Sequence, residues 1–212
     1  MENNNDAEKL WESYFYPNSD VLINKLGITD YNELTEKEAE ITFEKLVELY
    51  DKPILGNFDA KHLRNIHKYL FDELYDWAGD YRYINMQKQT GFTDHNNISE
   101  YLDNEFHLMH EELTKITTIG EFAAFIATYY AQLLIIHPFR EGNGRSSREF
   151  IRELVAEKSK QFSFGPLELD WTKFDSSIMN EDIQFALTFR GVIEHEFLKA
   201  LVHVDNDETK KM

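Results

Sequence analysis

The sequence contains no cysteine. A chain without cysteine forms neither disulfide bonds nor thiolate zinc sites, and this composition is typical of a reducing compartment. Residues 1–9 are polar and acidic and lack the apolar segment of a secretion signal. We also find no uncharged apolar run long enough to cross a bilayer. The expected location is therefore the cytoplasm, with no membrane partner.

Positive charge is also scarce. The chain has 22 Lys and Arg residues against 39 Asp and Glu residues, which gives a formal net charge of −17. Nucleic-acid binding needs clustered positive charge that neutralises phosphates, so we expect no nucleic-acid partner. A single nucleotide can still bind where positive charge gathers locally. Four arginines gather in one short segment: Arg140, Arg145, Arg148 and Arg152.

The length of 212 residues, with 42% apolar residues, is enough for one compact unit with a buried core. Both ends lack apolar periodicity. We therefore predict a disordered start at residues 1–13, one domain at 14–204 and a disordered tail at 205–212.

Apolar residues recur at helical spacing along most of this domain. Asp59 is a predicted helix cap, Thr118 and Glu121 have capping-box spacing, and Pro138 ends an apolar helix. Residues 80–97 alternate instead and contain QKQTG, which is the only strand-like stretch and indicates a β-hairpin or mobile flap. The predicted fold class is all-α with an inserted β-hairpin flap. The predicted helices are 35–50, 59–79, 98–113, 122–136, 146–158 and 180–203.

The segment between two of these helices carries the residues expected to do chemistry. Gly142 and Gly144 flank Asn143, which lets backbone N–H groups approach an anion, and the next helix directs its positive N-terminus there. His137 is a histidine, the residue type whose unperturbed pKa suits removal of a proton near neutral pH.

Two further residue types complete this chemistry. Arg145 and Arg148 are three residues apart on one helix face and can bind further phosphates with forked donors. Glu141 supplies a hard carboxylate suited to Mg²⁺. A base, a metal carboxylate, an anion cradle and a cationic clamp together indicate transfer of a phosphate group.

Residues 137–148 resemble the signature of the Fic family (filamentation induced by cAMP). The signature reads His-Pro-Phe-x-Asp/Glu-Gly-Asn-Gly-Arg-x-x-Arg, and this chain matches it at every specified position. Three further segments are similar to stand-alone bacterial Fic toxins, namely YFYPNSDVLINKLGI, GNFDAKHLRNIHKYLFDELYDWAG and LDWTKFD. The resemblance covers roughly residues 14–204.

The resemblance implies a protein adenylyltransferase, in which a hydroxyl of a target protein attacks the α-phosphorus of ATP and pyrophosphate leaves. It assigns proton removal to His137, Mg²⁺ binding to Glu141 and packing of the loop to Phe139. It assigns the anion hole and the outer phosphates of ATP to five residues: Gly142, Asn143, Gly144, Arg145 and Arg148.

The resemblance also narrows the chemistry and the way a target binds. The kinase-like Doc branch has lysine at the position of Gly144, and the phosphocholine-transferring branch departs at Gly142. This chain has the AMP-transfer form at both positions. The flap at residues 83–93 resembles the family hairpin on which a target segment adds a strand, with Lys88 and Phe92 as candidates for clamping the target side chain.

Many Fic proteins are inhibited by a helix with the pattern Ser/Thr-x-x-x-Glu-Gly/Asn, whose glutamate pairs with the second motif arginine. The pattern is absent from this sequence. We therefore expect inhibition by a separate antitoxin that supplies such a helix. Delivery of the chain into another cell stays open as an alternative. The target expected from the toxin resemblance is a type II topoisomerase subunit.

Competing interpretations remain for the site and the function. A phosphotransferase or an AMP-removing hydrolase could use the same scaffold, and a docking module without catalysis is a further alternative. His107 and His110 have a possible metal-ligand spacing, but their acidic neighbours favour a solvated helix face. Arg152 is interpreted as part of a solvated face paired with Glu149 and Glu153.

Overall fold

The computed structural model describes residues 4–86, 92–175 and 190–204 of the chain. Helices dominate these ranges, and the strands are short. The longer elements are α1 (Asn4–Glu12), α2 (Tyr31–Asp51), α3 (Ala60–Phe71), α4 (Ile98–Leu113), α5 (Ile119–Ile136), α6 (Asn143–Lys158) and α9 (Arg190–Ala200), together with β1 (Leu167–Leu169) and β2 (Leu201–His203). Three single turns of 3₁₀-helix also lie within the described ranges, at His95–Asn97, Ser159–Gln161 and Trp171–Lys173. The predicted all-α fold class is thus confirmed.

The chain divides into two compact units. The first unit comprises Met1–Asp103 and Ile136–Ser146, and the second comprises Asn104–Ile135 and Ser147–Met212. The loop between α5 and α6 and the first residues of α6 therefore belong to the first unit.

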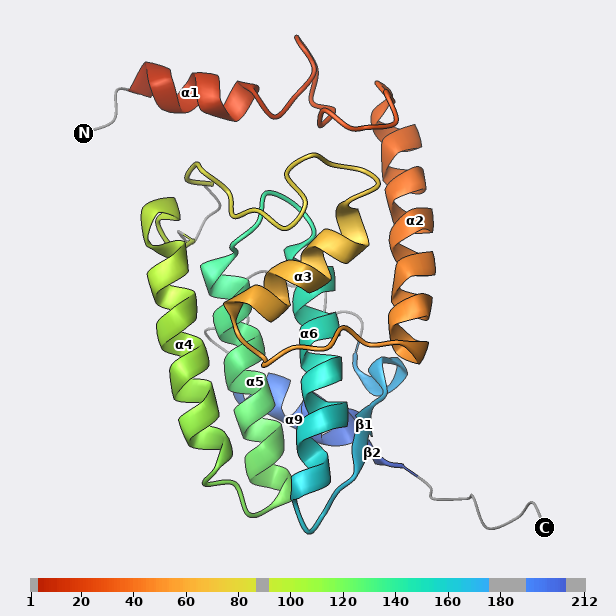
Figure 1. Ribbon diagram of the computed structural model, residues 1–212, viewed down its shortest axis with the longest axis vertical. Helices are drawn as coiled ribbons and strands as arrows, with labels where there is room; N and C mark the ends of the chain where they lie inside the picture. The colour runs from red at the N-terminus through yellow and green to blue at the C-terminus, as the bar shows by residue number, and fades with distance from the viewer. Residues whose placement is uncertain (1–3, 87–91, 176–189, 205–212) are drawn as a thin grey trace, which may run out of the picture. The chain divides into compact units, whose positions relative to one another are not determined.

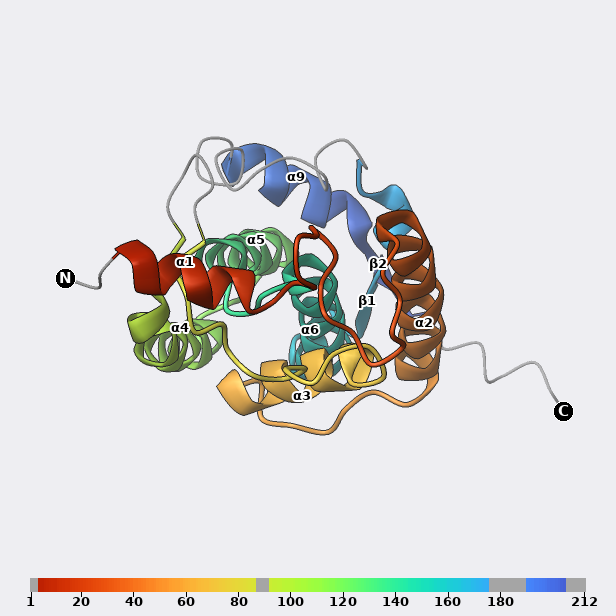
Figure 2. The same cartoon turned by 90° about the horizontal axis from the view of Figure 1, so that it is seen from above.

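In the first unit, α2 and α3 contact each other and cross at an angle (Figures 1 and 2). Asp30 caps α2 by accepting from the backbone N–H of Glu33 at 2.9 Å, and Asp59 caps α3 by accepting from that of His62 at 2.8 Å. Such caps satisfy N–H groups that have no acceptor inside the helix. The inner face of α3 is fully buried at Leu63, Ile66, Leu70 and Phe71.

In the second unit, α5 and α6 run side by side in both views (Figures 1 and 2). Phe106 of α4 contacts Phe150 of α6, and Tyr130 of α5 meets Phe197 of α9 edge to face with ring centroids 5.5 Å apart. β1 and β2 form a two-stranded antiparallel sheet in which Glu168 lies opposite Val202.

Helix α5 is, among the described residues, the one helix long and apolar enough to cross a membrane. Of this stretch, 56% is buried within the protein. A buried core helix has the same length and composition, so the finding is weak evidence for a membrane span.

Several predicted boundaries agree with the structure. Residues 98–113 form α4, and α5 ends at Ile136 before Pro138. The capping box is present, since the hydroxyl of Thr118 accepts from the N–H of Glu121 at 3.2 Å and the Glu121 carboxylate accepts from that of Thr118 at 3.1 Å.

Other boundaries differ. Helix α3 ends at Phe71 and does not continue to Gly79, because the chain turns there, with the N–H groups of Leu74 and Tyr75 both bonded to the carbonyl of Phe71. Helix α6 begins at Asn143, three residues before the predicted start. Disorder was predicted for residues 1–13, whereas Asn4–Glu12 form α1.

The two strands among the described residues lie outside the predicted flap. Residues 201–203 were assigned to the last helix, but they pair with residues 167–169 as β2 and β1. The described flanks of the predicted flap, residues 81–86 and 92–94, contain no strand. Residues 87–91 of the flap and 205–212 of the tail lie outside the described residues.

Candidate active site

The loop from His137 to Gly142 joins α5 to α6 and lies wholly within the first unit. His137 has a positive φ of 48°, which is uncommon for a residue with a side chain and turns the chain sharply after α5. Pro138 follows, and it cannot donate a backbone hydrogen bond to continue the helix. The predicted base therefore stands on a strained turn at a helix end.

Arg82 fixes the backbone of this turn. Its Nε donates to the carbonyl of His137 at 2.8 Å, and its own backbone N–H donates to the carbonyl of Pro138 at 2.8 Å. The other guanidinium nitrogens donate to the carbonyls of Ile84, at 2.8 Å, and of Thr93. Arg82 is 2% exposed, and burial lowers the pKa of its guanidinium. One buried side chain thus joins both described flanks of the flap to the histidine.

Phe92 lies directly on the imidazole of His137. The two rings are stacked, with centroids 3.9 Å apart and planes inclined by 18°. The structure therefore brings one of the two predicted flap residues to the predicted base. The other, Lys88, lies outside the described residues.

Phe139 points into the core of the first unit, where it is 1% exposed and stacks on His67 at 3.8 Å. His67 accepts at Nδ1 from the N–H of Gly79 at 2.8 Å, so Nε2 carries the proton and donates to the carbonyl of Glu141 at 3.0 Å. Burial lowers the pKa of His67 to about 3. The ring is therefore neutral and serves as a fixed donor to the loop.

The side chain of Asn143 closes the loop on itself. Its Oδ1 accepts from the backbone N–H of Phe139 at 2.8 Å, and its Nδ2 donates to the carbonyl of Phe139 at 2.8 Å. The residue is 3% exposed. The side-chain amide of Asn143 is thus engaged in holding the loop.

Gly142 occupies a position that excludes other residues. Its φ is +78°, and a Cβ at this position would lie 2.2 Å from Cζ of Phe71. Helix α6 begins immediately afterwards, and the N–H of Ser146 is bonded to the carbonyl of Gly142 at 3.0 Å. The N–H groups of residues 143–145 lie before this first intrahelical bond and have no acceptor inside the helix. The start of α6 therefore offers donors to an anion.

Glu141 presents a carboxylate next to these donors. Its side chain is 45% exposed, and Oε1 accepts from the N–H of Gly142 at 2.9 Å and lies 3.6 Å from Nη2 of Arg145. No group of three or more metal-ligating side chains occurs among the described residues. Mg²⁺ keeps several waters and commonly binds through one carboxylate and substrate phosphates, so a single exposed Glu141 fits this ion.

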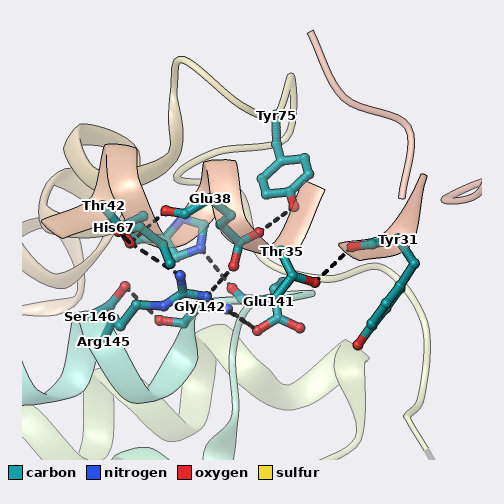
Figure 3. A network of polar contacts seen from close by, with 11 residues as sticks. Tyr31, Thr35, Glu38, Thr42, His67, Tyr75, Glu141, Gly142, Arg145 and Ser146 are labelled. Atoms are coloured by element: carbon teal, nitrogen blue, oxygen red, sulfur yellow. Dashed lines mark hydrogen bonds and ion pairs between the residues drawn. The ribbon is translucent and has the colours of Figure 1, made fainter. Parts of the chain in front are cut away.

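Arg145 lies in the first turn of α6 and contacts α2 and α3. Its Nη2 is paired with Oε1 of Glu38, and Nη1 donates to Oγ1 of Thr42 at 3.3 Å. The guanidinium lies over the ring of Phe71, with Cζ 4.7 Å from the centroid. Figure 3 shows the contacts of Arg145 with Glu38 and Thr42 beside Glu141 and Gly142.

The other three arginines of the segment have different surroundings. Arg140 is 7% exposed, lies 4.4 Å over the ring of Trp11, and its buried Nε has no hydrogen-bond partner among the described residues. Arg148 follows Arg145 on α6 and, within the second unit, hydrogen-bonds Tyr130. Arg152 makes a forked pair with Glu149, with distances of 2.8 and 2.6 Å.

These contacts correct two interpretations. The guanidinium of Arg140 is buried among aromatic rings and is not part of a gathered cationic group. The predicted pair of Arg152 is present, but its face is not solvated, because Glu149 and Glu153 are each 3% exposed. Burial raises the pKa of Glu149.

Sequence reasoning missed four residues that hold the site: Glu38, His67, Tyr75 and Arg82. Arg82, His67 and Glu38 lie 55, 74 and 107 residues before their partners in the loop or in α6, and Tyr75 acts through Glu38. No local pattern marks such a distant contact. The one available signal is the YRYIN stretch, where Arg82 is a cation between apolar residues.

Comparison with known proteins identifies the relatives of this site. The model of the Fic/DOC family matches residues 57–155, which include the whole loop. The chain is 32% identical over 188 residues to the protein adenylyltransferase VbhT of Bartonella schoenbuchensis, covering 86% of this chain and 39% of VbhT. It therefore spans well under half of that relative's length.

Two further relatives match over most of their own length. The probable protein adenylyltransferase y4lH of Sinorhizobium fredii is 30% identical over 166 residues, covering 76% of this chain and 80% of y4lH. The N-terminal Fic domain of a Bep effector protein from Bartonella quintana, solved with bound ADP, aligns with a TM-score of 0.80 and 25% identity, covering 92% of this chain and 96% of that one. The family match around the loop and these long alignments lead to one conclusion, which is that the chain belongs to the Fic/DOC family.

Proposed function

We propose that this chain is a protein adenylyltransferase. A hydroxyl side chain of a target protein attacks the α-phosphorus of ATP, a phosphate ester of AMP forms, and pyrophosphate leaves. The observation that carries this proposal is the loop itself, in which the His137 turn, the Glu141 carboxylate and the N-terminus of α6 lie close together along the chain and are held by Arg82, His67 and the Asn143 side chain.

The relatives support the same chemistry. VbhT and y4lH are named as adenylyltransferases, and the Bartonella quintana domain binds ADP. ATP is accordingly the nucleotide that we assign to this site.

We assign the roles along the loop as follows. His137 takes the proton of the attacking hydroxyl, as a positioned imidazole does in general base catalysis. The backbone N–H groups of Gly142, Asn143 and Gly144 hold phosphate oxygens at the positive end of α6, and the N–H of Gly142 exchanges its contact with Oε1 of Glu141 for the phosphate. Phe139 keeps the loop seated by packing against His67.

The charged side chains handle the rest of the nucleotide. Arg145 and Arg148, one turn apart on α6, bind the outer phosphates. Glu141 would hold Mg²⁺, which when bound neutralises phosphate charge and favours departure of pyrophosphate.

The target protein docks on the flap. Phe92, stacked on His137, and Lys88 clamp the segment that carries the acceptor hydroxyl. A segment that adds along the flap gains affinity from main-chain hydrogen bonds, and the two side chains select the residue presented to His137.

Labelled ATP tests the reaction type. The chain is incubated with bacterial lysate and ATP labelled at either the α or the γ position, in parallel with His137→Ala. The matched control is His107→Ala, a histidine of α4 whose side chain is 75% exposed. Label from the α position alone, lost in His137→Ala and kept in His107→Ala, is the expected result.

The other outcomes identify the rival functions. Transfer of γ-label would indicate a phosphotransferase, and release of AMP from labelled target would indicate an AMP-removing hydrolase. Binding of target without transfer of any label would leave a docking module. Each of these results contradicts the proposal.

Restraint by a separate antitoxin is part of the same proposal. The sequence lacks the inhibitory pattern, so a partner helix would supply the glutamate that pairs with Arg148. If the inhibitory helix belongs to a partner, the purified chain should bind ATP without inhibition. Deletion of one of its own segments should not raise ATP affinity, and a rise would contradict this proposal.

The proposed target is a type II topoisomerase subunit in the cytoplasm. Purified subunits incubated with the chain and α-labelled ATP should gain label on a Tyr, Ser or Thr residue, which mass spectrometry locates. Labelling of other lysate proteins with none on these subunits would refute this target and leave AMP transfer intact.

A further inference from the structure

Glu38 of α2 is a nearly buried carboxylate that contacts the proposed site from far away in the sequence. Its side chain is 13% exposed. One oxygen pairs with Nη2 of Arg145, and the other accepts a hydrogen bond from the hydroxyl of Tyr75. Figure 3 shows this chain of contacts running from Tyr75 through Glu38 to Arg145. The carboxylate is thus held from both sides.

Thr42, one turn further along α2, adds a second contact to the same guanidinium. Its hydroxyl donates to the backbone carbonyl of Glu38 at 2.8 Å, so its oxygen is oriented to accept from Nη1 of Arg145 at 3.3 Å. The ring of Phe71 supports one face of the guanidinium. The plane of the Arg145 head group is therefore defined by three separate neighbours.

A guanidinium fixed in this way has donors to spare. It carries five N–H groups in a rigid fork, and Glu38 and Thr42 each engage a different terminal nitrogen. An arginine that is already oriented loses less conformational entropy when it binds a phosphate. The Arg145 side chain keeps 23% of its surface exposed, so it is accessible to a ligand.

The alternative would be a gate, in which Glu38 occupies Arg145 and phosphate must displace it. The contacts of Glu38 argue against displacement. Tyr75 is fully buried and stacks on Trp77 at 4.4 Å, so the donor to Glu38 is itself fixed. Burial, followed by the nearby Glu38 carboxylate, raises the pKa of Tyr75, so its hydroxyl stays a donor.

We propose that Glu38, anchored by Tyr75, is a positioning residue that orients Arg145 for the outer phosphates of ATP. The inference rests on the proposed function, which assigns Arg145 to those phosphates. It extends the site to α2, outside the motif and outside the residues 57–155 that the family model matches.

ATP affinity measured by calorimetry and the KM for ATP test the proposal with Glu38→Ala, Glu38→Gln and Tyr75→Phe. Glu38→Ala should weaken ATP binding about tenfold or more, the effect of losing one charge-assisted orienting contact. Glu38→Gln keeps an acceptor for Arg145 and should lose less ATP affinity than Glu38→Ala. The ATP affinity of Tyr75→Phe should lie between those of Glu38→Gln and wild type. KM for ATP should rise by more than kcat falls. The matched control is Glu40→Gln, an exposed carboxylate of the same helix that pairs with Lys37 at 2.7 Å.

The direction of the change decides between positioning and other roles. Tighter ATP binding in Glu38→Ala would mean that the carboxylate opposes the phosphates and would overturn the proposal, as would unchanged affinity. A double-variant cycle with Arg145→Ala separates positioning from folding. Glu38→Ala should have little further effect on ATP affinity once Arg145 is removed, and a full additional loss would also overturn it.

Failure of this inference is distinguishable from failure of the proposed function. Transfer of α-label by wild type, with ATP affinity unchanged in Glu38→Ala, would refute the role of Glu38 alone. Wild type that binds ATP without transferring AMP would refute the proposed reaction, while the Glu38 variants still report on Arg145. Wild type that binds no ATP would refute both.

Discussion

The guanidinium of Arg82 donates from Nε to the backbone carbonyl of His137 at 2.8 Å. The same side chain bonds the carbonyls of Ile84 and Thr93, on the two sides of residues 87–91. The segment on which a target would dock and the residue that would remove its proton therefore share one buried cation. A displacement of either flank would therefore move Arg82 and, through it, the backbone carbonyl of His137.

Arg82→Lys should lower kcat for AMP transfer by about tenfold or more, because an ammonium cannot reproduce the planar fork that reaches several carbonyls at once. The measurement is steady-state kinetics with thermal unfolding in parallel. Arg64→Lys is the matched control, since Arg64 donates to the carbonyl of Gly79 and pairs with Asp80 on a more exposed surface. An unchanged kcat in Arg82→Lys would contradict the role assigned to Arg82.

His67 should make stability depend on pH. Burial lowers its pKa from 6.5 to about 3. Between these two pH values the unfolded chain is protonated at His67 and the folded chain is not. The stabilisation from neutral His67 is complete above pH 6.5 and is lost as the pH falls from 6.5 toward 3. At pH 5 the free energy of unfolding should have fallen by ~2 kcal/mol through this group.

The matched variant is His67→Gln, whose amide can both accept from Gly79 and donate to Glu141 but does not titrate. Free energies of unfolding from urea titrations at pH 7 and pH 5 give the comparison. Wild type should lose more stability than His67→Gln over this interval. Equal losses would show that His67 is protonated without penalty in the folded chain.

Gly142→Ala should be far more harmful than an alanine at another glycine with positive φ. Gly27 has a φ of +70°. Among the described residues other than its two chain neighbours, no heavy atom lies within 4 Å of the point where an alanine methyl would stand. Gly27→Ala should therefore lower the free energy of unfolding only by the backbone strain of about 1 kcal/mol. At Gly142 the methyl would meet Phe71 at 2.2 Å, adding an overpacking cost of about 1–3 kcal/mol.

Unfolding by denaturant measures both costs, and ATP affinity measures the shift of the loop. Phe71→Leu provides a second test, because the smaller side chain gives the added methyl more room. The double variant Gly142→Ala with Phe71→Leu should lose less free energy of unfolding than the sum of the losses in the two single variants. A fully additive result would mean that the Phe71 contact is not what makes glycine necessary.

Phe92→Ala should reduce transfer to a protein target by about tenfold, because His137 loses the ring stacked on it at 3.9 Å and rotates more freely. Phe92→Tyr keeps the ring and should retain most activity. The assay is α-label transfer at saturating ATP, where ATP affinity should be equal in both variants. Loss of ATP affinity in Phe92→Ala would assign Phe92 to the nucleotide and not to the target.

The sequence alone predicted those features that depend on neighbours along the chain. The caps at Asp59 and at Thr118 with Glu121 were predicted because a cap satisfies N–H groups two or three residues away. The order of residues from His137 to Gly144 likewise indicated an anion site, since a glycine-flanked turn before a helix is a local arrangement. The end of α3 was misjudged because its apolar spacing continues to Trp77 while the backbone turns at Phe71.

Only the tertiary structure decided which distant side chains meet this loop. Arg145 and Glu38 are 107 residues apart, and Arg82 and His137 are 55 residues apart. The pairing of β2 with β1 likewise joins two segments that are far apart in the sequence. Periodicity states which face of a helix is apolar, but it does not state which partner that face meets, because folding brings together side chains whose separation along the chain carries no signal.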